Sequence, residues 1–182
     1  MRSNELDLIF IPGLGGADPD HWQRRWAGKL ATARFVEQSD WDHPELSAWT
    51  AAIAAAAHSA TRPIVFVAHS LGVASLLHAL SALGGADIRG AFLVAPPCDA
   101  GLASIHCAAF ACEAFGPLPF GADLAASRDD AYCPYDRAQA MARQWGATLI
   151  DAGLAGHLNV ASGHGPWPEG LLRLAKFLGA LK

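Results

Sequence analysis

At 182 residues, the chain is long enough to bury a core of its own, and one domain is predicted over residues 1–182. Hydrophobic residues make up 52% of the sequence and charged residues 16%, which excludes an intrinsically disordered chain. The formal net charge of -4 is spread along the sequence without a basic cluster, so nucleic acid and anionic membrane surfaces are excluded as expected partners.

The first part of the chain predicts a strand, a turn and a helix. Residues 6–11 form an apolar run typical of a buried strand, and a glycine-rich turn follows over residues 12–16. A helix is predicted to begin near Asp18 and Pro19, which suit its N-cap and its first turn. The apolar side chains of this helix recur at helical spacing: Trp22, Trp26 and Leu30.

The next predicted elements again alternate between strands and helices. Residues 34–38 are predicted to form a short edge strand, and a helix is predicted to begin within residues 42–45. That helix carries one apolar face: Leu46, Trp49, Ile53 and Ala57. The β-branched run at residues 63–67 predicts a buried strand, and the Ala- and Leu-rich residues 73–83 predict a helix that a Gly-Gly pair ends.

A strand predicted at residues 91–95 ends at two prolines and leads into a segment without clear periodicity, residues 98–121. Its apolar side chains fit neither a full helix nor a strand: Leu102, Ile105, Phe110, Phe115, Leu118 and Phe120. Because a large exposed apolar patch is unusual in a soluble monomer, we expect a short cover over the C-terminal edge of the sheet. Some of these side chains are expected to line the site.

The last third of the chain predicts two strands, at residues 122–126 and 148–150, and two helices, at residues 134–145 and 168–181. The final helix is predicted to face inward through four leucines: Leu171, Leu174, Leu178 and Leu181. The alternation of strands with helices predicts an α/β fold. We expect a doubly wound, mainly parallel six-stranded sheet with helices on both faces.

The sequence Ala-His-Ser-Leu-Gly at residues 68–72 joins a predicted strand to a predicted helix. A sharp strand-to-helix turn with a central serine is the setting of a nucleophile elbow, which lifts the serine hydroxyl off the sheet. Small residues two before and two after Ser70 are needed because strand and helix cross closely, and Ala68 stands where glycine is usual. Ser70 is therefore the candidate nucleophile, with an ordinary helix N-cap as the alternative.

Candidate partners of this serine follow in the order Asp, then His. Asp129 and Asp130 follow one predicted strand, and His157 follows the next. Because the C-terminal ends of parallel strands meet at one edge of a sheet, these side chains are expected to converge on Ser70 there. A histidine can take the serine proton, and a carboxylate can orient the histidine.

Some nearby residues compete for these roles. Asp129 competes with Asp130, and His164 competes with His157. His157 directly follows a glycine after a strand, whereas His164 lies inside a Gly- and Pro-rich loop, where a structural or rim position is expected. His69 is adjacent to the nucleophile, but its side chain is expected to point elsewhere and to be packed or partly exposed.

Further motifs extend along nearly the whole chain: Ile11-Pro12-Gly13, His21-Trp22-Gln23, Val94-Ala95-Pro96-Pro97, Ser127-x-x-Asp130-x-x-x-Pro134, Gly156-His157-Leu158-Asn159 and Gly163-His164-Gly165-Pro166-Trp167-Pro168. With these motifs and the elbow, the chain resembles the small, lidless serine hydrolases related to retinoblastoma-binding protein 9. The resemblance implies a compact α/β hydrolase fold and a Ser-Asp-His triad, which carries over to Ser70, Asp130 and His157. The S-x-x-D-x-x-x-P frame of that family selects Asp130 rather than Asp129.

Acyl transfer needs two N–H donors for the oxyanion that forms on the substrate. The residue after the nucleophile, Leu71, is expected to supply one, and the loop after the first strand the other, with Leu14 preferred. Gly13 and Trp167 are the predicted substrate-binding residues, the latter because its loop lies near His157 in the sequence.

Several classes of partner and cofactor are not expected. No His or Cys pair has metal-ligand spacing, and the first glycine-rich loop lacks a phosphate-binding signature, so neither a metal nor an organic cofactor is predicted. The four cysteines form no C-x-x-C pair and are expected to be free thiols. Residues 1–7 lack the apolar run of a signal peptide, and no apolar run could cross a bilayer, which predicts a cytoplasmic protein without a membrane partner.

The main hypothesis is a cofactor-free serine hydrolase that cleaves small esters through an acyl-enzyme. Amide or peptide hydrolysis by the same three residues is the alternative, because leaving-group specificity depends on the loops at residues 14–20 and 98–121. A binding module that keeps the fold without catalysis is a third hypothesis, and the complete Ser-Asp-His set argues against it. The oligomeric state and the natural substrate stay open.

Overall fold

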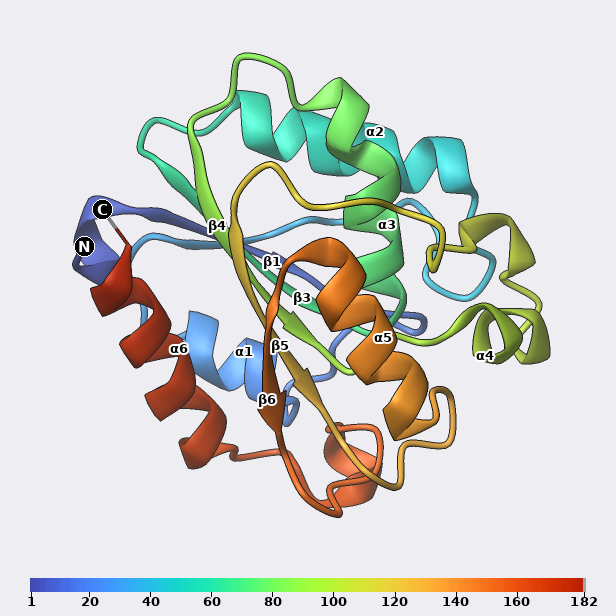
Figure 1. Cartoon of the computed structure of the whole chain (residues 1–182). Helices are drawn as coiled ribbons and strands as arrows, with labels where there is room; N and C mark the ends of the chain where they lie inside the picture. Colours follow the sequence, from blue (N-terminus) through green and yellow to red (C-terminus); the bar gives the residue numbers. More distant parts are fainter. Residues whose placement is uncertain (182) are drawn as a thin grey trace.

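Figure 1 shows the computed structural model, which describes residues 1–181. Within those residues six strands form one sheet in the order β2-β1-β3-β4-β5-β6, and every neighbouring pair is parallel. Helices cover both faces, so the predicted fold class is confirmed. The strands are β1 Asp7–Ile11, β2 Ala33–Phe35, β3 Ile64–His69, β4 Ile88–Val94, β5 Gly121–Ala126 and β6 Thr148–Asp151.

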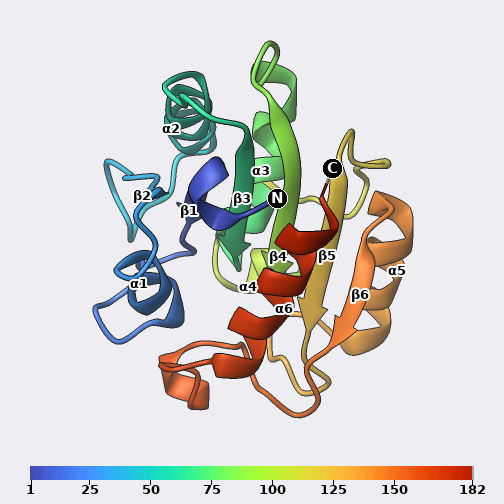
Figure 2. The same ribbon diagram turned by 90° about the vertical axis from the view of Figure 1, so that its left-hand side faces the viewer.

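The helices form two layers, and Figure 2 shows α6 in front of the sheet with α3 behind it. The α-helices are α1 Trp22–Ala27, α2 Leu46–His58, α3 Leu71–Ala79, α4 Asp99–Ser104, α5 Tyr135–Trp145 and α6 Pro168–Ala180. The layer with α2, α3 and α5 covers one face, and α1 and α6 cover the other. The chain runs from β1 to β2 in one direction along the sheet, and then from β2 past β1 to β3 and on to β4 in the other direction. Right-handed crossovers therefore place α1 opposite α2 and α3.

Successive residues of β1 belong to opposite layers of the core. Ile9 and Ile11 pack with the α2 layer, whereas Leu8 and Phe10 pack with the α1 layer. All four side chains have 0% exposure. A parallel strand covered on both faces requires an unbroken apolar run, which is the pattern that the sequence shows here.

The first helix begins later than predicted, at Trp22 rather than near Asp18. The Asp18 carboxylate accepts the N–H groups of Asp20 and His21, and this local turn ends before helical hydrogen bonding starts. His21 is the N-cap, because its Nδ1 accepts the N–H of Gln23.

The inward face of α6 also differs from the prediction. Leu174 and Leu178 are buried as expected, but Leu171 is 37% exposed, and Phe177 takes a place in the core. The buried residues 170, 174, 177 and 178 define a stripe centred on Leu174 and Leu178, and Leu171 lies at its flank.

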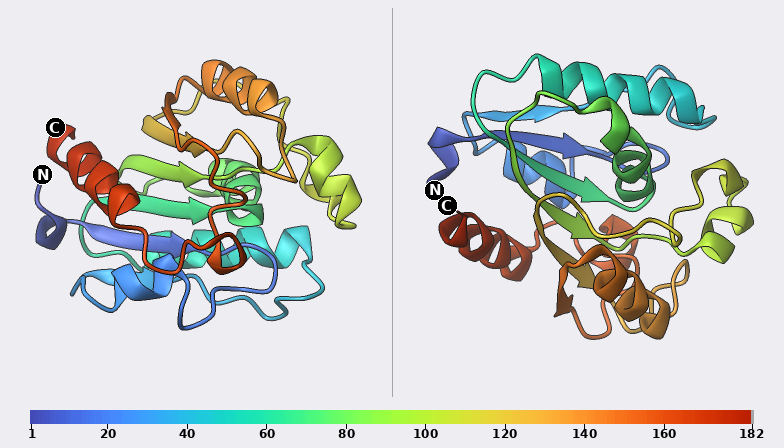
Figure 3. Two further views of the ribbon diagram at one scale, coloured as in Figure 1. Left: turned by 90° about the horizontal axis from the view of Figure 1, so that it is seen from below. Right: turned by 45° about the horizontal axis from the view of Figure 1, so that its top comes forward.

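All six arrows point towards the same edge of the sheet, as Figure 3 shows for the central strands. The loops after β1, β3, β4, β5 and β6 therefore begin at this edge. In the part of the chain that the structure describes, no helix is long and apolar enough to cross a membrane. Localisation in the cytoplasm stays a prediction.

The four cysteines are free, and all of them are buried: Cys98, Cys107, Cys112 and Cys133. Burial raises the pKa of the Cys107, Cys112 and Cys133 thiols above its usual value. These thiols lie around α4 and the loop after β5, where they act as small apolar side chains of the core.

Candidate active site

Ser70 occupies a strained turn between β3 and α3. Its backbone angles are φ 54° and ψ -127°, a region that residues with side chains rarely adopt. The turn brings the start of α3 against the end of β1: a Cβ atom on Gly72 would lie 2.4 Å from the carbonyl oxygen of Ile11. Glycine is required there, whereas Ala68 fits within the core with 0% exposure.

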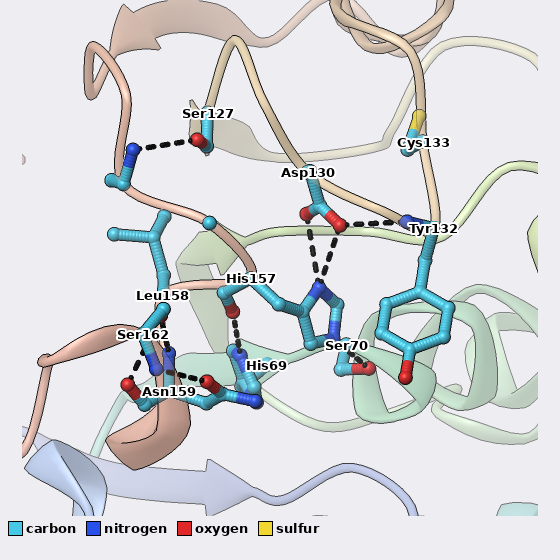
Figure 4. Close-up of polar contacts among 12 residues, drawn as sticks. His69, Ser70, Ser127, Asp130, Tyr132, Cys133, His157, Leu158, Asn159 and Ser162 are labelled. Atoms are coloured by element: carbon cyan, nitrogen blue, oxygen red, sulfur yellow. Dashed lines mark hydrogen bonds and ion pairs between the residues drawn. The ribbon is translucent and has the colours of Figure 1, made fainter.

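The structure brings Ser70, His157 and Asp130 together in one hydrogen-bonded chain (Figure 4). His157 Nε2 lies 2.7 Å from Ser70 Oγ. His157 Nδ1 lies 3.0 and 2.9 Å from the two carboxylate oxygens of Asp130. The side chains of His157 and Asp130 are 11% and 3% exposed, so little water competes for these bonds.

Asp129 has a different set of partners. Its Oδ1 accepts the Ser127 hydroxyl at 2.6 Å and the Gly156 N–H at 2.8 Å. The S-x-x-D-x-x-x-P frame selects Asp130, not Asp129, as the partner of His157, and the hydrogen bonds agree with that choice. Through its bonds to Ser127 and Gly156, Asp129 joins the loop after β5 to the loop that carries His157.

His69 contacts the same loop from the end of β3. Its Nε2 lies 3.0 Å from the carbonyl oxygen of His157 and donates to it, because a carbonyl can only accept. Burial lowers the pKa of His69 well below its usual value, which keeps the imidazole neutral. The expectation that this side chain packs is correct, but it lies beside His157 rather than away from the site.

The His21-Trp22-Gln23 motif supports the site from α1. Trp22 Nε1 donates to the carbonyl oxygen of Leu158 at 2.8 Å, directly after His157. Gln23 Nε2 donates to the backbone oxygens of Ile11 at 3.2 Å and Val67 at 3.1 Å. Since both groups are buried, α1 links the ends of β1 and β3 to the loop after β6.

The predicted oxyanion donors belong to Leu14, which lines the same cavity as Ser70, and to Leu71, which follows Ser70 in the chain. Gly13 abuts Ser70 so closely that a Cβ atom on it would lie 2.8 Å from the Ser70 Cβ. Leu14 follows Gly13 in the chain and lines the cavity. Leu71 is the first residue of α3, so the N–H of Leu71 has no acceptor within the helix. Within residues 1–181, the Leu14 N–H donates to no backbone oxygen.

A cavity of about 320 Å³ opens above Ser70. Its lining comes from the loops at the carboxyl edge of the sheet: Gly13, Leu14, Gly15, Gly16, Asp18, His21, His69, Ser70, Ile105, Tyr132, His157, Asn159, Val160 and Ala161. Burial lowers the pKa of His21 to about 4, so this histidine is neutral at physiological pH. No Lys or Arg is part of the lining within the described residues.

Trp167 does not line this cavity, contrary to the prediction. It is 6% exposed and stacks on Trp26, with ring centroids 5.6 Å apart, while its edge meets Trp22. A large aromatic ring at the start of α6 fills the core between α1 and the sheet instead of reaching substrate. His164 contacts Trp167 and likewise lies outside the lining.

The segment at residues 98–121 reaches the cavity through one side chain, that of Ile105. It contains α4 and a short 3-10 helix, Ala108–Phe110, although its periodicity was too weak to predict a helix. Leu102 and Phe110 are buried in the core, so most of the predicted cover packs downward.

Sequence reasoning assigned no role to Tyr132, Asn159 or His21, all of which line the cavity. Two of them lie in motifs that were recognised, but a motif does not show where a side chain points. Tyr132 had one usable signal: it lies two residues after Asp130, where its N–H can bond the carboxylate. No group of three or more His, Cys, Asp or Glu side chains is placed to hold a metal ion within residues 1–181.

Comparisons with known proteins identify the family and the fold of this chain. The model of a family described as serine hydrolase matches residues 8–176. The chain is similar to a crystal structure described as that of a YdeN-like hydrolase from Pectobacterium atrosepticum, with 32% identity, 96% of this chain and 91% of that chain covered, and a TM-score of 0.85. No curated protein sequence matches the chain.

More distant solved structures share the fold. The ydeN gene product from B. subtilis is 20% identical, with 96% of this chain and 99% of that chain covered and a TM-score of 0.79. The esterase RhEst1 from a Rhodococcus species is 13% identical, with 100% of this chain and 93% of that chain covered and a TM-score of 0.69.

Proposed function

The chain belongs to the serine hydrolase family, and we propose that it cleaves small carboxylic esters through an acyl-enzyme formed on Ser70. The observation that carries this proposal is the contact of 2.7 Å between Ser70 Oγ and His157 Nε2, with Asp130 bonded to the other ring nitrogen. This arrangement supplies an activated nucleophile and an oriented base.

In the first half of the reaction, Ser70 Oγ attacks the ester carbonyl while its proton moves to His157 Nε2. The new oxyanion accepts hydrogen bonds from the backbone N–H groups of Leu14 and Leu71. As the intermediate collapses, the bond to the leaving alcohol breaks, and the proton on Nε2 passes to the leaving oxygen. Asp130 stabilises the imidazolium that exists between these two proton transfers.

In the second half, a water molecule takes the place of the alcohol. His157 Nε2 accepts a proton from the water as its oxygen attacks the acyl carbon. The ester bond to Ser70 then breaks, the carboxylic acid leaves, and the proton returns to Oγ. Each bond made and broken is accounted for by the ester, one water molecule, Ser70 and His157.

The cavity favours small esters over long lipids. Its volume of about 320 Å³ is at the low end for a small-molecule site. Apolar side chains for a short acyl chain come from Leu14, Ile105 and Val160. An amide or peptide bond could be cleaved by the same steps, but no feature of the cavity favours an extended peptide.

Covalent labelling tests the proposal. A fluorophosphonate should label the wild-type protein, and Ser70→Ala should abolish the label and lower ester turnover by about 10³-fold or more. Ser47→Ala, which removes an exposed serine on α2, is the matched control and should keep both. Undiminished turnover in Ser70→Ala would refute the mechanism, and a wild-type protein that takes no label would favour a binding module.

A further inference from the structure

Tyr132 has a firmly held backbone. Its N–H donates to Asp130 Oδ1 at 2.9 Å, and its carbonyl oxygen accepts the Cys98 N–H at 3.1 Å. The helix α4 packs directly on this peptide, since a Cβ atom on Gly101 would lie 2.0 Å from the Tyr132 oxygen. A residue held at both backbone groups presents its side chain to the cavity in a defined position.

The phenol of Tyr132 packs edge-on against the imidazole of His157, with ring centroids 4.6 Å apart at 65°. Figure 4 shows the phenol alongside the imidazole, running from the Asp130 end towards the Ser70 end. The hydroxyl therefore lies towards the Nε2 end of His157. It has no hydrogen-bond partner among the described residues, although the residue lines the cavity.

The position of the leaving group follows from the proton transfers. His157 Nε2 must protonate the leaving oxygen, so this oxygen comes within hydrogen-bond reach of Nε2. The carbonyl oxygen of the substrate is directed to the backbone donors of Leu14 and Leu71. The space beside Nε2, where the Tyr132 hydroxyl lies, is thus left for the alcohol part of the ester.

We propose that Tyr132 binds the leaving group, and that its hydroxyl selects esters of polyhydric alcohols over esters of simple alkyl alcohols. This inference rests on the proposed esterase function and names the alcohol that the site prefers. It goes beyond the three reacting residues, because Tyr132 touches the substrate without moving the reacting proton.

The chemistry of the lining agrees with a neutral, hydroxylated leaving group. A phenol can donate and accept one hydrogen bond, which suits a hydroxyl. Asn159 adds a second donor: its Oδ1 accepts the Ser162 N–H at 3.0 Å, and its amide NH₂ has no protein acceptor within residues 1–181. Among the residues that the structure describes, the lining contains no Lys or Arg, so a phosphorylated or carboxylated alcohol would find no counter-charge.

The test compares two esters with the same acyl group, propyl butyrate and 2,3-dihydroxypropyl butyrate. The wild-type protein should hydrolyse the hydroxylated ester with the higher kcat/KM. Tyr132→Phe keeps the ring on His157 and the backbone bond to Asp130, and it removes only the hydroxyl. The ratio of the two kcat/KM values should fall by about five- to tenfold, the effect of losing one neutral hydrogen bond.

Tyr135→Phe is the matched control, because it removes the hydroxyl of the chain's other tyrosine, which lies outside the cavity lining beside Arg128. Its ratio should equal that of the wild-type protein. An unchanged ratio in Tyr132→Phe would overturn the inference, as would an equal loss on both esters, which would assign Tyr132 to the positioning of His157. Failure of the proposed function is a separate result, in which the wild-type protein hydrolyses neither ester.

Discussion

Asp129 and Asp130 are adjacent in the sequence, but their carboxylates act on different parts of the site. Asp130 faces Nδ1 of His157 with both oxygens and is almost fully buried. Asp129 is bonded to the Ser127 hydroxyl and the Gly156 N–H. Asp130 therefore acts on the imidazole itself, and Asp129 acts on the loop that carries it.

This difference predicts opposite outcomes for two neighbouring substitutions. Asp130→Asn should fold and lose about 10³–10⁴-fold in kcat, because an amide holds the imidazole in the wrong tautomer. Asp129→Asn retains an acceptor oxygen for both of its donors and should keep most of the activity. Turnover of a p-nitrophenyl ester and thermal unfolding measure both effects. If Asp129→Asn were the inactive variant, the assignment would be wrong by one residue.

Residues could be placed from the sequence where a local pattern fixes the backbone. Ser70 is such a case, since a strand, a small-residue turn and a helix leave one geometry for the elbow. Trp167 was misplaced because its sequence position near His157 does not say whether a ring packs inward. Tyr132 was missed because its role depends on a contact with His157, which lies on the loop after another strand.

Among the elements at the carboxyl edge, the segment at residues 98–121 contributes least to the cavity wall. Most of its apolar side chains pack on the core, and Ile105 alone is part of the lining within the described residues. A single isoleucine side chain therefore limits the cavity on this side.

For this element we expect a short acyl preference that Ile105 enforces. Across p-nitrophenyl esters of rising acyl length, kcat/KM should stop rising by medium chain length. Ile105→Ala should move the optimum to longer chains by about two methylene groups, each of which contributes about 0.8 kcal/mol when buried. Leu118→Ala, in the same segment but outside the lining, should leave the optimum unchanged. A wild-type kcat/KM that climbs well past medium length would contradict this.

Whether a segment forms a helix or a strand was easier to predict from the sequence than where the helix begins or which of its side chains are buried. The helix α2 follows its sequence pattern, with Trp49, Ile53 and Ala57 buried. The start of α1 was misplaced because the Asp18 carboxylate caps a turn instead of the helix. In α6, Leu171 and Phe177 are both apolar, and only the sheet beneath the helix decides which of them is buried.

Over the whole molecule, two buried histidines connect folding to pH. Burial lowers the pKa of His21 to about 4 and that of His69 well below its usual value. The nearby Asp18 opposes the shift at His21, and His157 adds to it. Both side chains are neutral in the folded protein, whereas in the unfolded chain they take up protons near the ordinary histidine pKa of about 6.5.

The free energy of unfolding should therefore be fully maintained above pH 6.5 and should fall as the pH drops from about 6.5 towards 4. His21 alone should account for a loss of about 2 kcal/mol at pH 5. Urea unfolding at pH 7.5 and pH 5 measures the difference. The variant His21→Asn keeps an N-cap acceptor for the Gln23 N–H, and it should reduce the difference in the free energy of unfolding between the two pH values. An equal difference in the variant would show that His21 is not buried in its neutral form.

The buried thiols and the elbow serine together give this molecule two opposite chemical reporters. A thiol must ionise to react, so Cys107, Cys112 and Cys133, whose pKa burial raises, react with iodoacetamide only in molecules that have opened. A fluorophosphonate, in contrast, modifies Ser70 only while His157 is held against it. In one tube, the initial rate of thiol labelling follows the open fraction and the initial rate of serine labelling follows the closed fraction, so the ratio of the two rates follows the folding equilibrium without any optical signal.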